Sequence, residues 1–171
     1  MSTTTLEETG MQGQNMGANQ YLTFMLGGEE YGVNILKVKE IRGWEEPTLL
    51  PNTAEYVLGV INLRGMVVPV MDLRRRFGMQ KTEYDKTTVV VIVKVGFSGR
   101  ERTIGMVVDA VSEVYNISDE MIMPSPDLGG TISDEYVKGL ATIQEKMIIL
   151  LDIDYLVNEG MLKEADNVQQ D

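Results

Sequence analysis

The sequence lacks two reactive side chains: none of its 171 residues is cysteine or histidine. It therefore cannot form a disulfide, a thiolate nucleophile, a Ser-His-Asp triad or a zinc site built from cysteine and histidine. Long apolar runs are missing as well. The strongly apolar stretch 87–93 lies between Lys86 and Lys94, whereas a membrane span needs about 20 residues. Any catalysis would depend on carboxylates, lysine, tyrosine, hydroxyls or a carboxylate-bound metal, and we expect no direct membrane insertion.

Positive charge is also scarce. Lysine and arginine number 15 against 26 aspartates and glutamates, which gives a formal net charge of −11 at pH 7. This balance argues against binding of nucleic acid or anionic lipid, because both need a cationic surface. We expect a disordered tail at residues 1–19 and an acidic tail at residues 159–171. Since the N-terminal segment has neither the basic nor the apolar region of a signal peptide, we expect a cytoplasmic protein.

What the sequence does contain is an internal repeat. Residues 55–59, Glu-Tyr-Val-Leu-Gly, return as residues 135–139, Glu-Tyr-Val-Lys-Gly, and the alignment continues without a gap to Asp72 and Asp152, 80 residues apart. We interpret the repeat as a duplication. The residues alone leave open whether the two copies form separate barrels or parts of one sheet. A second match lies upstream at a spacing of 73 residues, and it pairs Gly32, Val38, Glu40 and Ile41 with Gly105, Val111, Glu113 and Val114.

The two halves, residues 20–83 and 84–158, are predicted to consist mainly of short strands. Alternating apolar residues mark 21–26 as a strand, and Arg64-Gly65 is the two-residue connection of a hairpin. Many short strands with glycine-containing turns point to small barrels or sandwiches. A unit of about 65 residues is marginal on its own, so we expect the halves to share a core and to unfold together. Short helices are expected at 35–41, after Asn52 or Thr53, from Ser133, and after Asp152 or Asp154.

Two charged residues, Arg64 and Glu40, have both a plain and a functional interpretation. A turn arginine is commonly just solvated, but on a rigid hairpin it can also pair with a partner's carboxylate; the second half has Gln144 there. Glu40, between Val38 and Ile41 in a short helical or extended segment, can mark the half-buried edge of an element. Two such apolar-acidic strips facing each other would instead border a groove for an amphipathic helix of a partner. The second half repeats the strip at Val111, Glu113 and Val114.

The remaining motifs indicate no catalytic or cofactor site. Arg74-Arg75-Arg76 is the only basic run, and we interpret it as a water-facing helical turn whose other side buries Leu73 and Phe77. No glycine-rich phosphate loop, calcium loop or nucleophile elbow is present. Asp72 and Asp152 are expected to cap the helices that follow them. The sequence therefore favours a binding module with no catalytic residue, metal or cofactor.

Three segments, 26–33, 38–43 and 59–74, resemble the CheW-like domain family of bacterial chemotaxis coupling proteins. The most specific part is the Asn-Leu-Arg-Gly hairpin at 62–65 with its flanking strands. The resemblance covers nearly the whole body of the chain, and it implies a mainly β fold of two small five-stranded SH3-like β-barrels packed on a shared core, with short helices. It also implies a non-enzymatic scaffold or adaptor in two-component signal transduction, which couples transmembrane chemoreceptors to the histidine kinase CheA and supports the receptor array.

The resemblance also implies partners and contact residues. The cytoplasmic tip of a methyl-accepting chemotaxis receptor would lie in a groove between the barrels, and the CheW-like regulatory domain of CheA would dock barrel to barrel. The protein would be recruited to arrays at the inner face of the cytoplasmic membrane. Two alternatives stay open: a coupling protein of another chemosensory pathway, for pili or second-messenger control, and, less favoured, a carboxylate-based hydrolase or small-ligand-binding barrel. The implied receptor-binding residues are Val38, Glu40, Arg64, Val111 and Val114, and the implied kinase-binding residues are Met66, Val67 and Val68.

Overall fold

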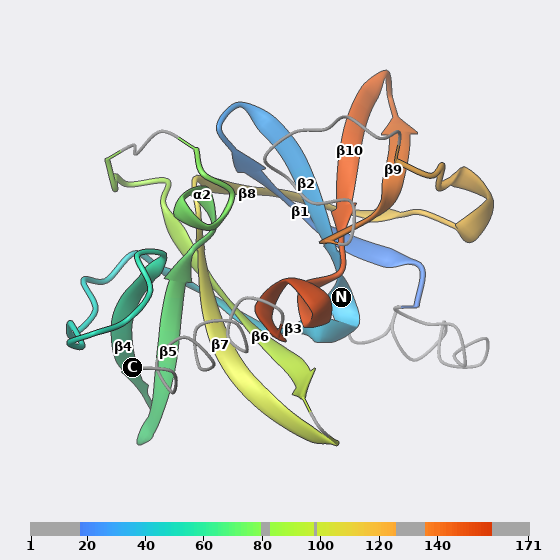
Figure 1. Cartoon of the computed structure of the whole chain (residues 1–171). Helices are drawn as coiled ribbons and strands as arrows, with labels where there is room; N and C mark the ends of the chain where they lie inside the picture. The colour runs from blue at the N-terminus through green and yellow to red at the C-terminus, as the bar shows by residue number, and fades with distance from the viewer. Residues whose placement is uncertain (1–17, 80–82, 98, 126–135, 159–171) are drawn as a thin grey trace, which may run out of the picture.

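Ten strands make up most of the structure, a computed structural model that describes residues 18–79, 83–97, 99–125 and 136–158 (Figure 1). The first half contains β1 (Gln20–Leu26), β2 (Glu29–Asn34), β3 (Val38–Gly43), β4 (Val57–Leu63) and β5 (Met66–Asp72). The second half contains β6 (Val89–Phe97), β7 (Arg100–Val108), β8 (Ala110–Asn116), β9 (Val137–Ile143) and β10 (Lys146–Leu151). Short helical turns are η2 (Ile35–Lys37), α2 (Leu73–Arg76) and η3 (Asp119–Met121), and residues 153–158 are α-helical. The prediction of a mainly β fold with short helices is confirmed.

The strands form two five-stranded sheets that lie side by side (Figure 1). Sheet A has the strand order β8-β1-β2-β10-β9, and sheet B has the order β3-β6-β7-β5-β4. Each order is linear, so strand pairing alone closes neither sheet. An isolated bridge nevertheless joins the segment after one edge strand to the opposite edge in each sheet: Thr48 pairs with Val60, and Met123 pairs with Leu140. The predicted pair of five-stranded barrels is thus found as two open, curved sheets.

Each sheet takes strands from both halves of the sequence. Sheet A combines β1 and β2 with β8, β9 and β10, and sheet B combines β3, β4 and β5 with β6 and β7. Repeat-related residues have equivalent places: Gly32 pairs with Leu150 in the parallel contact of β2 with β10, and Gly105 pairs with Val70 in the parallel contact of β7 with β5. The copies have therefore exchanged strands, a point that the sequence left open.

Two glycines allow the parallel contacts that join the exchanged strands. A Cβ atom on Gly32 would lie 3.0 Å from Leu150, and one on Gly105 would lie 2.9 Å from Val90 and 3.3 Å from Val70. Side chains packed to normal interior density have little room to yield at such distances. The upstream repeat thus has glycine in both copies where a neighbouring side chain crosses the strand.

The two hairpin tips share one backbone shape. Arg64 and Gly65 have φ angles of 50° and 87°, and Gln144 and Glu145 have φ angles of 51° and 69°. Positive φ at both central residues is typical of the type I′ turn, whose twist suits a two-residue hairpin. The first tip is also held by the side chain of Asn62, whose Oδ1 accepts a hydrogen bond from the amide of Gly65 at 2.8 Å. The predicted hairpin at Arg64-Gly65 is confirmed.

The core has three parts, and the largest joins the two sheets. It includes Phe24 and Tyr31 of sheet A and Val93 of sheet B, all almost fully buried, and the rings of Phe24 and Tyr31 stack with their centroids 6.2 Å apart. A second cluster around Val68 lies within sheet B, and a third around Ile148 lies within sheet A. Because the largest cluster takes residues from both halves, neither half buries its apolar residues alone. The expectation that they unfold together rests on this shared cluster.

Asp72 and Asp152 cap the helical turns that follow them, as predicted. Asp72 Oδ1 accepts a hydrogen bond from the amide of Arg74 at 2.9 Å, and Asp152 Oδ1 accepts one from the amide of Tyr155 at 3.1 Å. Such side-chain caps satisfy amides that have no partner within the helix. The repeat therefore preserves, at the end of each copy, the aspartate that caps the helical turn.

The other predicted helices are mostly not found. Of the helix predicted at 35–41, only 35–37 is helical, because residues 38–43 pair with β6 as a strand. The segment at Asn52 is a turn, and its φ of 57° breaks a helix. The helix predicted from Ser133 starts outside the described residues. None of the helices in the described part of the chain is long and apolar enough to span a membrane.

The prediction that the arginines at 74–76 face water is wrong. The side chain of Arg74 is 2% exposed, and its guanidinium lies 3.0 Å from Asp109 and 3.3 Å from Asp72. The short helix α2 packs against β7, and Asp109 follows that strand directly. The other two arginines are half-buried. Asp72 and the distant Asp109 thus supply the counter-charge that makes burial of Arg74 possible.

Candidate functional site

Glu40 and Arg64 form an ion pair at the rim of sheet B. Glu40 lies on the edge strand β3, opposite Ile92 of β6. Arg64 lies at the tip of the β4-β5 hairpin, at the other edge of the sheet. The curvature of the sheet brings these edges together, and Arg64 Nη2 donates a hydrogen bond to Glu40 Oε2. The sequence predicted both residues as contacts, but it did not predict that they pair.

The two members of this pair differ in exposure. The side chain of Arg64 is 72% exposed and that of Glu40 is 28% exposed. The hydrogen bond from Arg64 holds the pKa of Glu40 below its ordinary value. Desolvation opposes this effect, and the charges of Arg64, Arg42 and Lys39 add to it. Both groups are therefore charged near neutral pH, and a partner meets a guanidinium and a carboxylate side by side.

Val38 and Val111 border the core that joins the sheets. They occupy equivalent positions on the edge strands β3 and β8, and both are half-buried against the shared cluster. Three residues further on, Ile41 is 43% exposed and Val114 is 48% exposed. Each edge strand thus carries a half-buried valine, a glutamate and an exposed aliphatic residue. Since β3 and β8 belong to different sheets, a groove between these strips would have one edge of each sheet as its borders.

The three residues considered for kinase binding differ in accessibility. Met66 is 47% exposed and Val67 is 67% exposed, whereas Val68 is fully buried in the cluster within sheet B. Beside the two exposed residues lies a cavity of about 260 Å³, lined by Met66, Val67, Pro69, Arg102, Thr103 and Ile104. Met66 and Val67 therefore offer an apolar contact surface, and Val68 holds their strand in place from inside.

Sequence reasoning missed an exposed apolar segment between β3 and β4. Leu49 is 78% exposed and Leu50 is 44% exposed. The segment is held against the sheet at Thr48, whose carbonyl oxygen would lie 2.1 Å from a Cβ atom on Gly59. Two consecutive leucines immediately before Pro51 in an irregular segment were the available signal, since a solvated loop rarely needs them.

The chemistry that these surfaces offer is recognition. Within the described residues, no group of three or more acidic side chains is placed to hold a metal ion. The exposed features are one ion pair, two aliphatic strips and an apolar hairpin edge. Such features suit binding to another protein.

Comparison with known proteins agrees with this description. The model of the CheW-like domain matches residues 20–161. The chemotaxis protein CheW of Klebsiella aerogenes is 42% identical over 158 residues, which are 92% of this chain and 92% of that protein. The probable chemotaxis protein CheW of Rhizobium etli is 37% identical over 145 residues, 85% of this chain and 91% of that protein.

A solved structure is similar as well. The scaffolding protein TtCheW from Thermoanaerobacter tengcongensis matches with a TM-score of 0.73 at 37% identity, and the match covers 81% of this chain and 91% of that one. Sequence and fold therefore agree along most of the chain. The chain belongs to the CheW-like domain family of chemotaxis scaffold proteins, which are not enzymes.

Proposed function

We propose that this chemotaxis scaffold couples transmembrane chemoreceptors to the histidine kinase CheA. The observation that carries the proposal is the exposed Glu40–Arg64 pair, which lies in the region matched by the family model, next to aliphatic side chains on a sheet edge. A coupling protein needs two contact surfaces and no reactive centre. The ion-pair rim and the apolar edge of the β4-β5 hairpin are two such surfaces.

The receptor surface consists of Val38, Glu40, Arg64, Val111 and Val114. Its valines bury apolar area against the receptor tip, and its ion pair sets the orientation through charge-assisted hydrogen bonds. Because Glu40 is held by Arg64 before binding, little side-chain entropy is lost when a partner pairs with it. This pre-arranged pair makes the two charged residues the expected hot spots.

The kinase surface consists of Met66 and Val67 with the adjoining cavity. Exposed methionine and valine beside a cavity are suited to an apolar side chain of the CheW-like regulatory domain of CheA. The buried Val68 supports this surface without touching the partner. The two surfaces are close, since Arg64 and Met66 belong to the same hairpin, so receptor and kinase would meet on one small scaffold.

Binding to receptor and kinase would recruit the protein to receptor arrays at the inner face of the cytoplasmic membrane. We expect each interface to be small and its individual affinity to be modest. In an array the contacts act together, because each bound partner raises the effective concentration of the next.

The test is binding to both partners, followed by kinase activity. The full chain is incubated with a receptor cytoplasmic fragment and with CheA, and bound protein is measured by co-sedimentation and pull-down. We expect binding to each partner, and a change in CheA autophosphorylation when all three are combined. Binding to neither partner would contradict the proposal.

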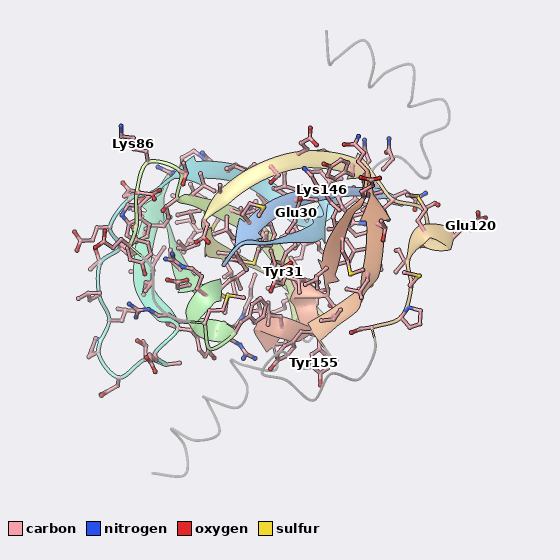
Figure 2. The ribbon with its side chains drawn as sticks, turned by 90° about the horizontal axis from the view of Figure 1, so that it is seen from above. Glu30, Tyr31, Lys86, Glu120, Lys146 and Tyr155 are labelled. Carbon is pink, nitrogen blue, oxygen red and sulfur yellow. The ribbon has the colours of Figure 1, made fainter. Side chains whose placement is uncertain are left out.

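A charge-matched control separates the site from general charge effects. Glu40→Lys is expected to reduce receptor binding, whereas Glu120→Lys makes the same charge change on η3, at the far end of the molecule (Figure 2). Glu120 is exposed, so its substitution should leave the fold and the binding unchanged. Equal losses in the two variants would remove Glu40 from the site.

A further inference from the structure

The mouths of the two sheets, each made by an edge strand and the facing hairpin tip, differ in charge. In sheet B, Glu40 of β3 pairs with Arg64 of the β4-β5 tip. The repeat places Glu113 of β8 and Gln144 of the β9-β10 tip at the equivalent positions in sheet A. Gln144 has nearly the same φ as Arg64, 51° against 50°, but its side chain is neutral. Within the described residues, Glu113 forms no ion pair.

Glu30 adds a second carboxylate to the mouth of sheet A, and this one is buried. It lies on β2, opposite Met25 of β1 and Ile148 of β10, and it is 8% exposed. Its Oε2 has no hydrogen-bond partner, and no basic side chain in the described part of the chain forms an ion pair with it. A buried carboxylate oxygen without a donor is unfavourable, so a partner's donor that reached it would supply a hydrogen bond that the described residues do not.

Tyr115 links the two carboxylates. It lies on β8 and packs, half-buried, against the apolar cluster within sheet A. A hydrogen bond to Glu113, desolvation and the negative charges of Glu113 and Glu30 raise the pKa of Tyr115 to about 12. Glu113 is two residues from Tyr115 on β8, and Glu30 lies opposite Ile148 of the same apolar cluster, so the three side chains lie on one face of sheet A. Thr23 fixes the strand there, because its hydroxyl bonds the carbonyl and the amide of Glu113 at 3.0 and 3.2 Å.

We propose that Glu30, Glu113 and Tyr115 form a binding site for an arginine side chain of a partner protein. A guanidinium can donate to two carboxylates at once, because its five N–H groups form a planar fork. It can also lie against the ring of Tyr115. In sheet B, Arg64 of the same chain supplies this group to Glu40. The site lies on the other sheet from that pair, so it adds a contact beyond those of the proposed coupling function.

Lys146 is the basic residue on the strand next to Glu30, and both residues are labelled in Figure 2. It begins β10, two residues before Ile148, which pairs with Glu30. Lys146 is exposed, and in the described structure it forms no ion pair. It therefore lowers the local negative charge without filling the site. Lys146→Met, which introduces the residue type of Met66 at the equivalent position, is expected to strengthen arginine binding.

The test is an NMR titration of the full chain with N-acetyl-arginine amide, with the neutral N-acetyl-citrulline amide as control. We expect saturable shift changes at the amides of Glu30, Glu113 and Tyr115 with the arginine compound only, at a Kd of about 1–10 mM, typical of a single side chain. Glu113→Gln should weaken binding about threefold, and Glu30→Gln about tenfold, because the latter removes a charge that is buried rather than exposed. Equal shifts with the citrulline compound would overturn the proposal.

Gln144→Arg is the sharpest variant, because it places at the tip of sheet A the residue found at the tip of sheet B. The introduced guanidinium should pair with Glu113, abolish binding of the arginine compound and raise Tm by about 1–3 °C. Thr142→Arg adds the same charge at an exposed position on β9, and it should leave binding within about twofold of the original value. Undiminished binding to folded Gln144→Arg protein would overturn the proposal.

The titration is independent of the proposed coupling function. It contains neither receptor nor kinase, so its failure would leave coupling untouched, and a failure of coupling would leave this site untouched. Circular dichroism of each variant reports its fold. Glu113 is exposed, so Glu113→Gln keeps the test decisive even where Glu30→Gln disturbs the sheet.

Discussion

Two equivalent junctions of the molecule carry an ion pair with the charges reversed. In the first, Arg74 follows β5 and pairs at 3.0 Å with Asp109, which follows β7. In the second, Asp154 follows β10 and pairs at 2.8 Å with Lys37, which follows β2. The repeat places Arg74 and Asp154 at equivalent positions, 80 residues apart. The duplication has therefore kept a link between the same elements while the cation and the anion have changed places.

The aspartate of each junction also accepts a hydrogen bond from a backbone amide. Asp109 accepts a hydrogen bond from the amide of Gly27 at 2.9 Å, and Asp154 accepts one from the amide of Gly96 at 3.0 Å. Gly27 and Gly96 are equivalent because the β1-β2 hairpin and the β6-β7 hairpin pair their strands in the same register. The cations differ in burial, since Arg74 is 2% exposed and its counterpart is 37% exposed. The two junctions thus share the same arrangement of elements and hydrogen bonds. They differ in how deeply the cation is buried, and this burial sets how much each ion pair contributes to stability.

Arg74→Met is expected to have the largest effect on stability. It removes the guanidinium from two carboxylates in a buried site, and breaking a buried pair in this way costs about 3–5 kcal/mol. The matched change Lys37→Met breaks the pair at the other junction, which water can screen, and should cost about 1 kcal/mol or less. Urea denaturation of both variants measures the difference. Similar losses would contradict the conclusion that burial separates the two junctions.

Alanine at the glycines of the parallel contacts should have the next largest effect. Gly105→Ala forces a methyl group to within 2.9 Å of Val90, and overpacking of this kind costs about 1–3 kcal/mol. Gly32→Ala should cost less, because its nearest neighbour is a single terminal methyl of Leu150 at 3.0 Å, whereas Gly105 has both Val90 and Val70 within 3.3 Å. Gly43→Ala is the control, since nothing lies within 4 Å of its Cβ position. A neutral Gly105→Ala in thermal denaturation would show that the exchanged strands are loosely packed.

At the rim of sheet B, charge reversal should weaken receptor binding and leave the fold intact. Glu40→Lys or Arg64→Glu is expected to reduce affinity for the receptor fragment roughly 5- to 100-fold, the range for hot-spot residues. Gln144→Glu changes the equivalent tip of sheet A and should have little effect on this partner. Co-sedimentation at several protein concentrations gives the affinities. Loss of receptor binding by Gln144→Glu alone would assign the receptor to the other sheet.

Much of this architecture was predictable because the repeat preserves local geometry. The hairpin at Arg64-Gly65 and the caps at Asp72 and Asp152 depend on residues close in sequence, and these predictions are confirmed. Strand exchange was not predictable, because exchanged and unexchanged copies present the same alternation of apolar residues. The helix predicted at 35–41 failed for a related reason: its residues pair with β6, and that distant strand overrides local preference.

The site was predictable only in part. Glu40 and Arg64 stood out as charged residues beside apolar ones, but their pairing depends on the curvature of the sheet. Arg74 appeared to be solvated because one of its two counter-ions, Asp109, lies far along the chain and the other, Asp72, was predicted only to cap the helix. Charges at long sequence separation are paired by the fold, so their partners cannot be read from neighbouring residues.

The smallest expected effect is the pH dependence of stability that Tyr115 contributes. It tests whether the mouth of sheet A is more negative than that of sheet B. The pKa of Tyr115, about 12, lies above the ordinary value of 10.0, first because of the hydrogen bond to Glu113 and then because of desolvation and nearby negative charge. A raised pKa means that the folded protein holds this proton more tightly than the unfolded chain. The resulting contribution to stability is fully present below about pH 10 and is lost as the pH rises through about 12.

The measurement compares the tyrosinate absorbance of the protein with that of Tyr115→Phe as the pH rises, with circular dichroism to confirm the fold. The difference should titrate with a midpoint of about 12, and Glu113→Gln should move that midpoint towards the ordinary value. Gln144→Arg should also lower it, because a cation beside Glu113 stabilises tyrosinate. The equivalent position in sheet B is Arg42, so the rim of sheet B has no tyrosine there to compare. A midpoint near 10 in the folded protein would mean that no common negative field surrounds Tyr115, and the arginine site in sheet A would lose its electrostatic basis.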